Sequence, residues 1–202
     1  MKKYLIFIVI VCFIFSCSST NDENITEAEP VFYKGMDLSF QSELESYNIP
    51  YKNALGKPFD LEFDIIGLSY YPQFQIKDLS LVQSKINELA LTFNKDILMV
   101  EIAYRFTLEW NDNSINYIGD KNQILTEFPA TPEGQKAYLE WMVSIIKKIP
   151  NNKGLGFCYW APDWVAFTGN VTTSTNGSAW ENQCLFDFNF KALPAFEIYN
   201  SN

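Results

Sequence analysis

The sequence predicts an α/β fold in which helices alternate with the strands of a parallel sheet. Four short apolar runs are typical of buried strands, and helical patterns separate three of them. The 202 residues are 48% hydrophobic and 16% aromatic, a composition that argues strongly against a disordered chain and supports one sizeable core. We therefore expect one α/β domain without internal repeats.

The strands follow from the apolar runs. In chain order they are expected at Phe32–Phe40, Phe63–Tyr70, Ile97–Tyr104 and Gly154–Trp160. Between the second and third strands, apolar residues recur at helical spacing from Leu79 to Phe93, which predicts an amphipathic helix.

Two further helices are expected downstream. One begins after Thr131, a favourable N-cap residue that precedes Pro132, and it ends near Lys147. The other covers Lys191–Tyr199, although Pro194 interrupts its pattern.

The N-terminal segment is typical of an export signal. Residues 1–16 have a basic start and an apolar run, and Cys17 follows Ser16 as in a bacterial lipobox. We expect lipidation of Cys17, a flexible polar tether over residues 17–30 and a folded domain over 31–202. The protein would then be anchored in a bacterial cell envelope, in the periplasm or at the cell surface. A plain signal peptide and an uncleaved anchor are the alternatives.

Charge and composition limit the possible ligands. The formal net charge is −9, which argues against binding to nucleic acid or an anionic surface, and neutral substrates fit better. There is no His, so zinc sites and triads or dyads that use His are excluded. Five Trp, eleven Tyr and 17 Phe suit the stacking of sugar faces, or they form a simple aromatic core. Cys158 and Cys184 form one disulfide or remain two buried free thiols.

Glu101 is the first candidate for a catalytic group. It follows four consecutive apolar residues in the third expected strand, where burial of a charge is unfavourable unless the charge is paired or used. Chemistry in α/β enzymes is placed at this C-terminal edge of the sheet. Two long loops, Arg105–Ala130 and Ala161–Gln183, follow strands at the same edge and are expected to line a groove. The alternative is a glutamate that turns into solvent or pairs with a lysine.

Seven sequence blocks in order resemble one enzyme family. They are Gly35–Ser39, Phe63–Pro72, Val100–Tyr104, Thr131–Gln135, Tyr159–Trp160, Trp180–Gln183 and Phe186–Phe188. Together they resemble glycoside hydrolase family 53, the arabinogalactan endo-β-1,4-galactanases, which are retaining enzymes with a (β/α)8 barrel. The resemblance implies galactan or arabinogalactan oligosaccharides as ligands and no required cofactor.

The resemblance also implies that the barrel is incomplete. The four expected strands resemble barrel strands 1, 6, 7 and 8, and the segments for strands 2 to 5 have no counterpart between Gln41 and Glu62. We therefore expect an α/β fold that is a partial (β/α)8 barrel. Its open edges would leave backbone groups unpaired, which favours self-association or pairing of the edges with each other or with a partner.

Roles for individual residues follow from the same resemblance. Glu101 is the expected nucleophile, whereas the family's acid/base, a glutamate after an asparagine, has no counterpart, because the step Asn87-Glu88 lies in a helical pattern. Substrate-binding roles are expected for the following residues: Asp37, Tyr70, Trp160 and Asp187. Tyr70 is expected beside Glu101. The alternatives are that Tyr70 and Trp160 pack the sheet and that Asp37 pairs with a lysine.

The loop after the Glu101 strand raises the question of calcium. Bacterial family members often bind calcium near this point, and Asp112, Asn113 and Asn116 carry suitable oxygen atoms. A solvated loop is the alternative. The sequence also departs from the family at Arg105, where a proline is usual, and at Ala161, where a glutamate is usual.

Two functions therefore remain open from the sequence. The chain is a galactan-hydrolysing glycosidase, or it is a catalytically inactive lipoprotein that at most binds galactan. The family blocks favour the first, and the missing acid/base favours the second.

Overall fold

The computed structural model describes residues 52, 54–57, 64–167 and 177–200. The chain divides into two units, Met1–Phe59 and Asp60–Asn202, and each is described by itself. In the first unit the described residues are Lys52 and a turn around Gly56, whose φ is 74°. The expected signal peptide, tether, lipidation site Cys17 and first strand, with Asp37, lie outside the described residues.

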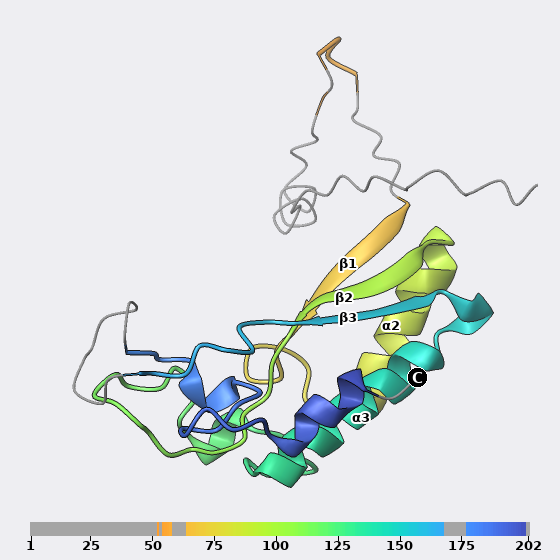
Figure 1. Ribbon diagram of the computed structural model, residues 1–202. Coiled ribbons are helices and arrows are strands. Elements are labelled where there is room, and N and C mark those ends of the chain that lie inside the picture. The colour runs from red at the N-terminus through yellow and green to blue at the C-terminus, as the bar shows by residue number, and fades with distance from the viewer. Residues whose placement is uncertain (1–51, 53, 58–63, 168–176, 201–202) are drawn as a thin grey trace, which may run out of the picture. The chain divides into compact units, whose positions relative to one another are not determined.

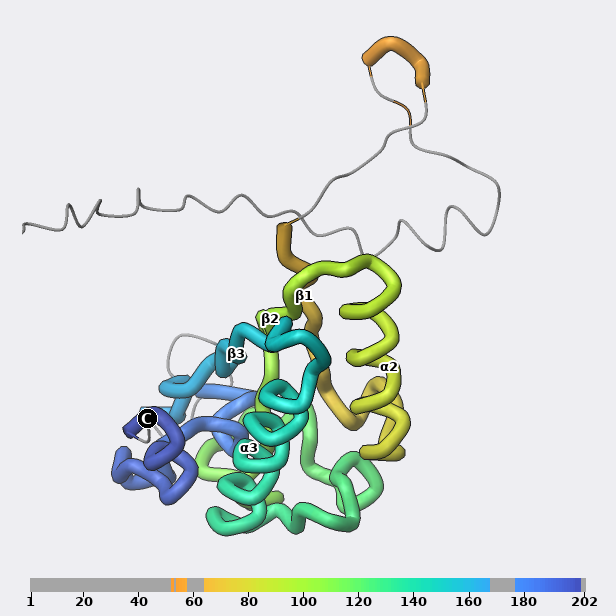
Figure 2. Tube along the Cα trace, turned by 90° about the vertical axis from the view of Figure 1, so that its right-hand side faces the viewer, coloured from red at the N-terminus to blue at the C-terminus, as the bar shows by residue number. Residues whose placement is uncertain are grey.

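The second unit is built on a three-stranded parallel sheet (Figure 1). Its strands are β1 (Ile65–Tyr70), β2 (Asp96–Ile102) and β3 (Gly154–Tyr159), in the order β1-β2-β3. Helix α2 (Leu79–Phe93) connects β1 to β2, and α3 (Pro132–Lys147) follows β2 and precedes β3. Both helices share one hydrophobic core with the sheet, so they cover the same face of it (Figure 2). The predicted α/β alternation is confirmed.

The helix boundaries have local causes. The side chain of Asp78 accepts hydrogen bonds from the backbone N–H groups of Ser80 and Leu81 and so begins α2. Asn94, with a φ of 50°, ends it in the left-handed region. Thr131 caps α3 by accepting a hydrogen bond of 3.0 Å from the N–H of Gly134, as predicted. Within the described residues, no helix is long and apolar enough to cross a membrane.

The predicted last helix is wrong in type and extent. The described residues contain four short 3-10 helices: η1 (Lys121–Gln123), η2 (Pro150–Asn152), η3 (Glu181–Gln183) and η4 (Pro194–Tyr199). Before η4, Ala192 forms an antiparallel bridge with Phe186, and the carboxylate of Asp187 accepts the N–H of Lys191 at 2.9 Å. The bridge and the following proline leave room only for the short 3-10 helix.

A bulge in β2 changes the expected end of that strand. Leu68 pairs with Met99 and Ser69 pairs with Glu101, so Val100 is an extra residue in β2. An extra residue of this kind bends a strand and re-aims the side chain beside it. The strand then ends at Ile102 rather than at Tyr104.

The two cysteines for which a disulfide was considered are not joined to each other. Both Cys158 and Cys184 are free thiols, and Cys158 is exposed, so the alternative of two buried thiols holds for Cys184 alone.

A Cβ atom on Gly154 would lie 2.1 Å from the carbonyl oxygen of Ile146. The absence of a side chain at Gly154 therefore allows β3 to approach α3 closely.

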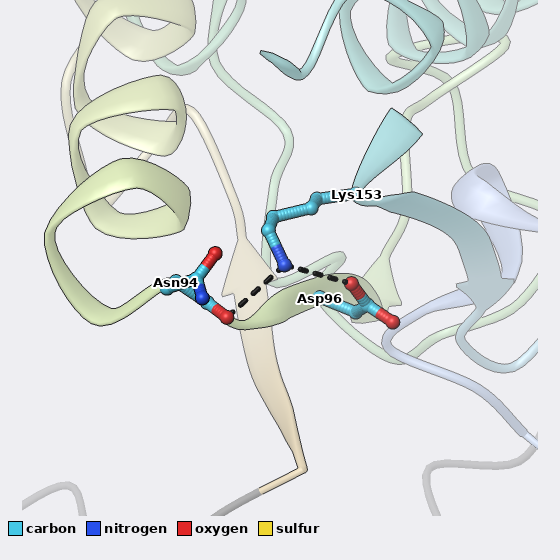
Figure 3. Close-up of polar contacts among 3 residues, drawn as sticks. All are labelled: Asn94, Asp96 and Lys153. Carbon is cyan, nitrogen blue, oxygen red and sulfur yellow. Dashed lines mark hydrogen bonds and ion pairs between the residues drawn. The ribbon is translucent and has the colours of Figure 1, made fainter. Parts of the chain in front are cut away.

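At the N-terminal edge of the sheet, where the strands begin, Lys153 links neighbouring segments (Figure 3). Its ammonium donates to the carbonyl of Asn94 at 3.0 Å and approaches Asp96 Oδ1 at 3.5 Å. Its own carbonyl accepts the N–H of Ile97 at 2.7 Å. One residue thus joins the start of β3 to the start of β2.

Candidate active site

Glu101 lies next to the C-terminal end of β2 on the face of the sheet opposite the helices. Its neighbour Ile102 is fully buried in the core, and side chains alternate along a strand, so Glu101 points away from the core. The carboxylate is half-buried, and the ion pairs of the described part involve other residues. The lysine-paired alternative therefore finds no support among the described residues.

The hydroxyl of Tyr71 donates a hydrogen bond of 3.4 Å to Oε2 of Glu101. Burial, and after it the negative charge of Glu101, raises the pKa of Tyr71, so the phenol remains protonated and can donate. Such a donor fixes the direction of the carboxylate. Tyr71 directly follows β1 and Glu101 lies in β2, so two neighbouring strands position the two groups.

Tyr70, expected beside Glu101, lies in the core instead. It is 5% exposed, packs against Trp141 of α3 and donates its hydroxyl to the carbonyl of Ile76 at 2.7 Å. The structure therefore favours the alternative that Tyr70 packs the sheet. The reason is strand alternation, because Tyr70 pairs with the core residue Ile102.

Trp160 follows β3 directly and lies at the same edge of the sheet. Its backbone N–H donates to the carbonyl of Ile102 at 2.8 Å, which fixes it beside the end of β2. The indole is half-buried and makes edge contacts with Trp164 at 5.2 Å and Trp180 at 5.0 Å between ring centroids. The indole of Trp160 thus packs against two other rings and leaves part of its surface exposed to solvent.

Two cations tie the loop after β1 to the loop after β2. Arg105 is fully buried and donates to the carbonyl of Gln123 and to Gln73 Oε1, each at 3.1 Å. Lys77 donates to the adjacent carbonyl, that of Asn122. Burial lowers the pKa of Arg105, whose guanidinium also lies 4.8 Å from the centre of the Tyr104 ring. Arg105, the residue that departs from the family pattern, therefore joins the two loops through buried hydrogen bonds.

In the loop for which calcium or a solvated loop was considered, protein groups bind the polar side chains. Asp112 is buried, and its two oxygens accept the N–H groups of Ser114 at 2.7 Å and Ser178 at 2.6 Å. Asn113 is exposed, and Asn116 donates its amide to the carbonyl of Glu109. No group of three or more acidic, cysteine or histidine side chains able to hold a metal forms within the described ranges. Calcium binding by this loop remains a prediction, because the described side chains form protein hydrogen bonds and calcium would need six to eight oxygen ligands.

Asp187 has a structural partner set. One of its oxygens accepts the backbone N–H groups of Asn189 at 2.8 Å and Lys191 at 2.9 Å, so it shapes the turn before η4. A role in binding hydroxyl groups remains a prediction for this residue.

Comparison with known proteins identifies the family. The family model for glycosyl hydrolase family 53 matches residues 57–199, which is well over half of the chain. The chain belongs to this family. An arabinogalactan endo-β-1,4-galactanase of Cellvibrio japonicus is 40% identical over 144 residues, covering 70% of this chain and 37% of the relative. An endo-β-1,4-galactanase of Bacillus subtilis is 26% identical over 168 residues, covering 69% and 38%.

A solved structure of the same family gives the fold. The family 53 catalytic domain of Ignisphaera aggregans matches with a TM-score of 0.62 and 29% identity, covering 69% of this chain and 39% of that domain. The sheet and its helices are therefore part of an α/β barrel, as predicted. The chain spans less than two fifths of the length of these family 53 relatives.

Sequence reasoning missed two residues that make contacts at this edge of the sheet, Tyr71 and Glu181. Tyr71 directly follows the predicted residue Tyr70, and alternation along β1, where Ile66 and Leu68 also pack against the core, could have selected it. Glu181 is fully buried and accepts the N–H of Asn111 at 2.6 Å, which joins the loops after β2 and β3. No local signal predicts that contact, because the two residues are 70 positions apart.

Proposed function

We propose that this family 53 chain recognises β-1,4-galactan and that Glu101 occupies the position of the nucleophile. The single observation that carries the proposal is the orientation of Glu101, which points out of the core beside Val100 and accepts the Tyr71 hydroxyl. An oriented carboxylate at this edge of the sheet is suited to attack an anomeric carbon. The galactanase names of the relatives support galactan as the substrate class.

A retaining mechanism also requires a second carboxylate, and the described part of this site lacks a candidate for it. A retaining glycosidase needs an acid/base roughly 5 Å from the nucleophile to protonate the leaving oxygen. The Asn-Glu step of this sequence places Glu88 on α2, where it pairs with Lys85 at 2.7 Å. We therefore propose that the chain lacks this acid and acts only on substrates whose leaving group departs without a proton.

Kinetics on two substrates test this proposal. We expect slow release of an activated aryl β-galactoside and no detectable hydrolysis of unactivated galactan. Glu101→Gln should abolish the release, whereas Glu127→Gln, an exposed control, should retain it. Aryl-galactoside turnover that is equal in Glu101→Gln and the wild type would reject Glu101 as the nucleophile. Galactan hydrolysis that disappears in Glu101→Gln would show that an acid is present.

The second candidate function is binding without catalysis. It is favoured by the short coverage of the galactanase relative, 37% of its length, because a groove needs two walls. We expect galactan affinity in the millimolar range or weaker, measured by calorimetry or affinity electrophoresis. Micromolar binding would contradict the view that the remaining part of the groove is a weak site.

We also propose self-association through the open sheet. Strands β1 and β3 are the edge strands of the described sheet, and Leu155 on β3 is 50% exposed. Sedimentation velocity should show a dimer that Leu155→Lys weakens. The matched control is Leu91→Lys on α2, where the leucine is 55% exposed. A monomer at all concentrations would reject the proposal.

Anchoring through Cys17 remains a proposal that rests on the sequence. It places the protein in the cell envelope, held by a lipid rather than by a spanning helix. Metabolic labelling with a fatty-acid analogue should mark the wild type and the control Cys12→Ala but not Cys17→Ala. Equal labelling of all three would reject the site.

A further inference from the structure

Six aromatic rings contact one another in succession at the C-terminal edge of the sheet. We call them the aromatic row, and in spatial order they are Tyr71, Phe74, Tyr117, Trp180, Trp160 and Trp164. Successive ring centroids lie 6.5, 5.7, 4.6, 5.0 and 5.2 Å apart. The rings come from the segments that follow all three strands, so the fold brings together residues that are far apart in the sequence.

The middle of the aromatic row is open to solvent. Phe74 is 59% exposed and Tyr117 is 54% exposed, although each contacts two other rings of the row. Exposed apolar surface that is continuous over several side chains marks a binding site more often than scattered single residues do. Flat rings with one free side are suited to stack on the apolar face of a sugar.

These two rings are held in place before any ligand arrives. The N–H of Tyr117 donates to the carbonyl of Ala179 at 2.9 Å, which joins the loop after β2 to the segment after β3. The N–H of Phe74 donates to the carbonyl of Tyr71 at 3.0 Å, which closes a turn after β1. A site built from restrained loops loses less conformational entropy on binding.

The ligand that fits this surface is neutral and extended. The chain has a net charge of −9, which disfavours anions, and the nearby cations Lys77 and Arg105 donate to neutral acceptors of the protein. The row also continues to Glu101 through the hydroxyl of Tyr71. A polymer unit on the row would therefore be connected to the units at the carboxylate.

We propose that Phe74 and Tyr117 form a distal subsite that stacks one hexose unit of a β-1,4-galactan chain bound at Glu101. The inference rests on the proposed galactan recognition and adds the location of a second contact along the polymer. Trp160 lies further along the row, where its N–H donates to the carbonyl of Ile102 at the end of β2. The distal subsite makes affinity depend on oligosaccharide length.

Calorimetric titration with β-1,4-galacto-oligosaccharides of increasing length tests the subsite. In the wild type, affinity should rise from the disaccharide to the longer oligosaccharides. Phe74→Ala and Tyr117→Ala should each lower the affinity for the longest ligand about fivefold, which corresponds to the loss of about 1 kcal/mol for one stacked ring. Both should leave disaccharide affinity unchanged. Phe93→Ala is the matched control, because Phe93 is 57% exposed at the end of α2.

Each other outcome has a definite meaning. Equal affinity of wild type and Phe74→Ala for the longest ligand, in protein shown to be folded by circular dichroism, overturns the subsite and leaves the proposed function intact. Equal loss for short and long ligands also overturns it, since the rings would then act at Glu101. If the wild type binds no galacto-oligosaccharide, the proposed function fails together with the subsite. Loss of self-association in Phe74→Ala would assign the rings to a second copy and overturn the sugar subsite.

Discussion

The two ends of the parallel strands, which form the N-terminal and the C-terminal edge of the sheet, are built in different ways. At the N-terminal edge, connections are short, and Lys153 joins β2 to β3 through one side chain and one backbone carbonyl (Figure 3). At the C-terminal edge, long loops extend from the strands (Figure 1). The buried polar or charged residues of the described part all lie at this C-terminal edge. They are Arg105, Asp112, Asn116, Gln135, Glu181, Asn182 and Gln183.

From this difference we expect the N-terminal edge to contribute to the stability of the fold and the C-terminal edge to contribute to ligand recognition as well. Long loops have backbone groups that no regular element satisfies, so buried side chains must supply the hydrogen bonds. Those side chains hold in place the loops that carry the aromatic row beside Glu101. The N-terminal edge needs only to close the fold. Substitutions there should change stability without changing binding, whereas substitutions at the other edge should change both or binding alone.

The largest effect is expected for Gln135→Leu. The amide of Gln135 is fully buried and donates to the carbonyls of Tyr104 at 2.8 Å and Cys184 at 2.9 Å. Leucine would leave both carbonyls without this donor, so the free energy of unfolding should fall by about 3 kcal/mol. Urea unfolding measures this. Glu140→Leu, on the exposed side of the same helix, should change it by less than about 0.5 kcal/mol. Similar losses in both variants would contradict a special role for the C-terminal edge.

Trp160→Ala should have the next largest effect, on binding. Removing the indole deletes its contacts with Trp164 and Trp180 and, under the proposed galactan recognition, a stacking surface, so galactan affinity should fall about tenfold. Trp141→Phe is the control, because Trp141 packs beneath the sheet against Tyr70 and Phe128. It should lower stability and leave affinity unchanged. Unchanged affinity in folded Trp160→Ala would assign Trp160 to the core.

The sequence predicts the regular elements well because their signals are local. The bounds of α2 agree with the apolar spacing from Leu79 to Phe93, and the cap at Thr131 is where its side chain predicts it. The position of Glu101 at the end of a buried strand was also predictable. The bulge at Val100 was not, because an extra residue in a parallel pair depends on the register with β1 rather than on composition.

The site is less predictable because it depends on contacts between loops. Tyr117 and Trp180 are neighbours only because the loops after β2 and β3 pair through Ala179. Asp112 carried the residue type expected of a calcium ligand, yet its oxygens bind backbone N–H groups. Residue type alone does not distinguish these roles.

A smaller effect is expected from the titration of Glu181. Burial raises the pKa of this carboxyl above its ordinary value, even though it accepts the backbone N–H of Asn111. A raised pKa means that the folded state binds the proton more tightly than the unfolded state. Stability should therefore decline as the pH rises from about 4.5 through the raised pKa.

The variant Glu181→Gln should remove this decline, because its amide does not titrate. Urea unfolding at a series of pH values measures the slope, and Glu133→Gln, an exposed site in the first turn of α3, is the control. A parallel pH profile in Glu181→Gln and the wild type would show that other groups cause the dependence.

The smallest effect is expected at the N-terminal edge, for Lys153→Met. The ion pair with Asp96 is 3.5 Å long and Asp96 is partly exposed, so the Coulomb attraction is weak and screened. The bond to the carbonyl of Asn94 is shorter, 3.0 Å, and supports the left-handed residue that ends α2. Methionine retains the aliphatic stem and removes both contacts, so the free energy of unfolding should fall by about 0.5 to 1 kcal/mol. Galactan affinity should stay equal to that of the wild type, because the carboxylate and the aromatic row lie at the other edge. A loss of affinity in folded Lys153→Met would show that the two edges are coupled through β2 and would break the separation of stability from recognition.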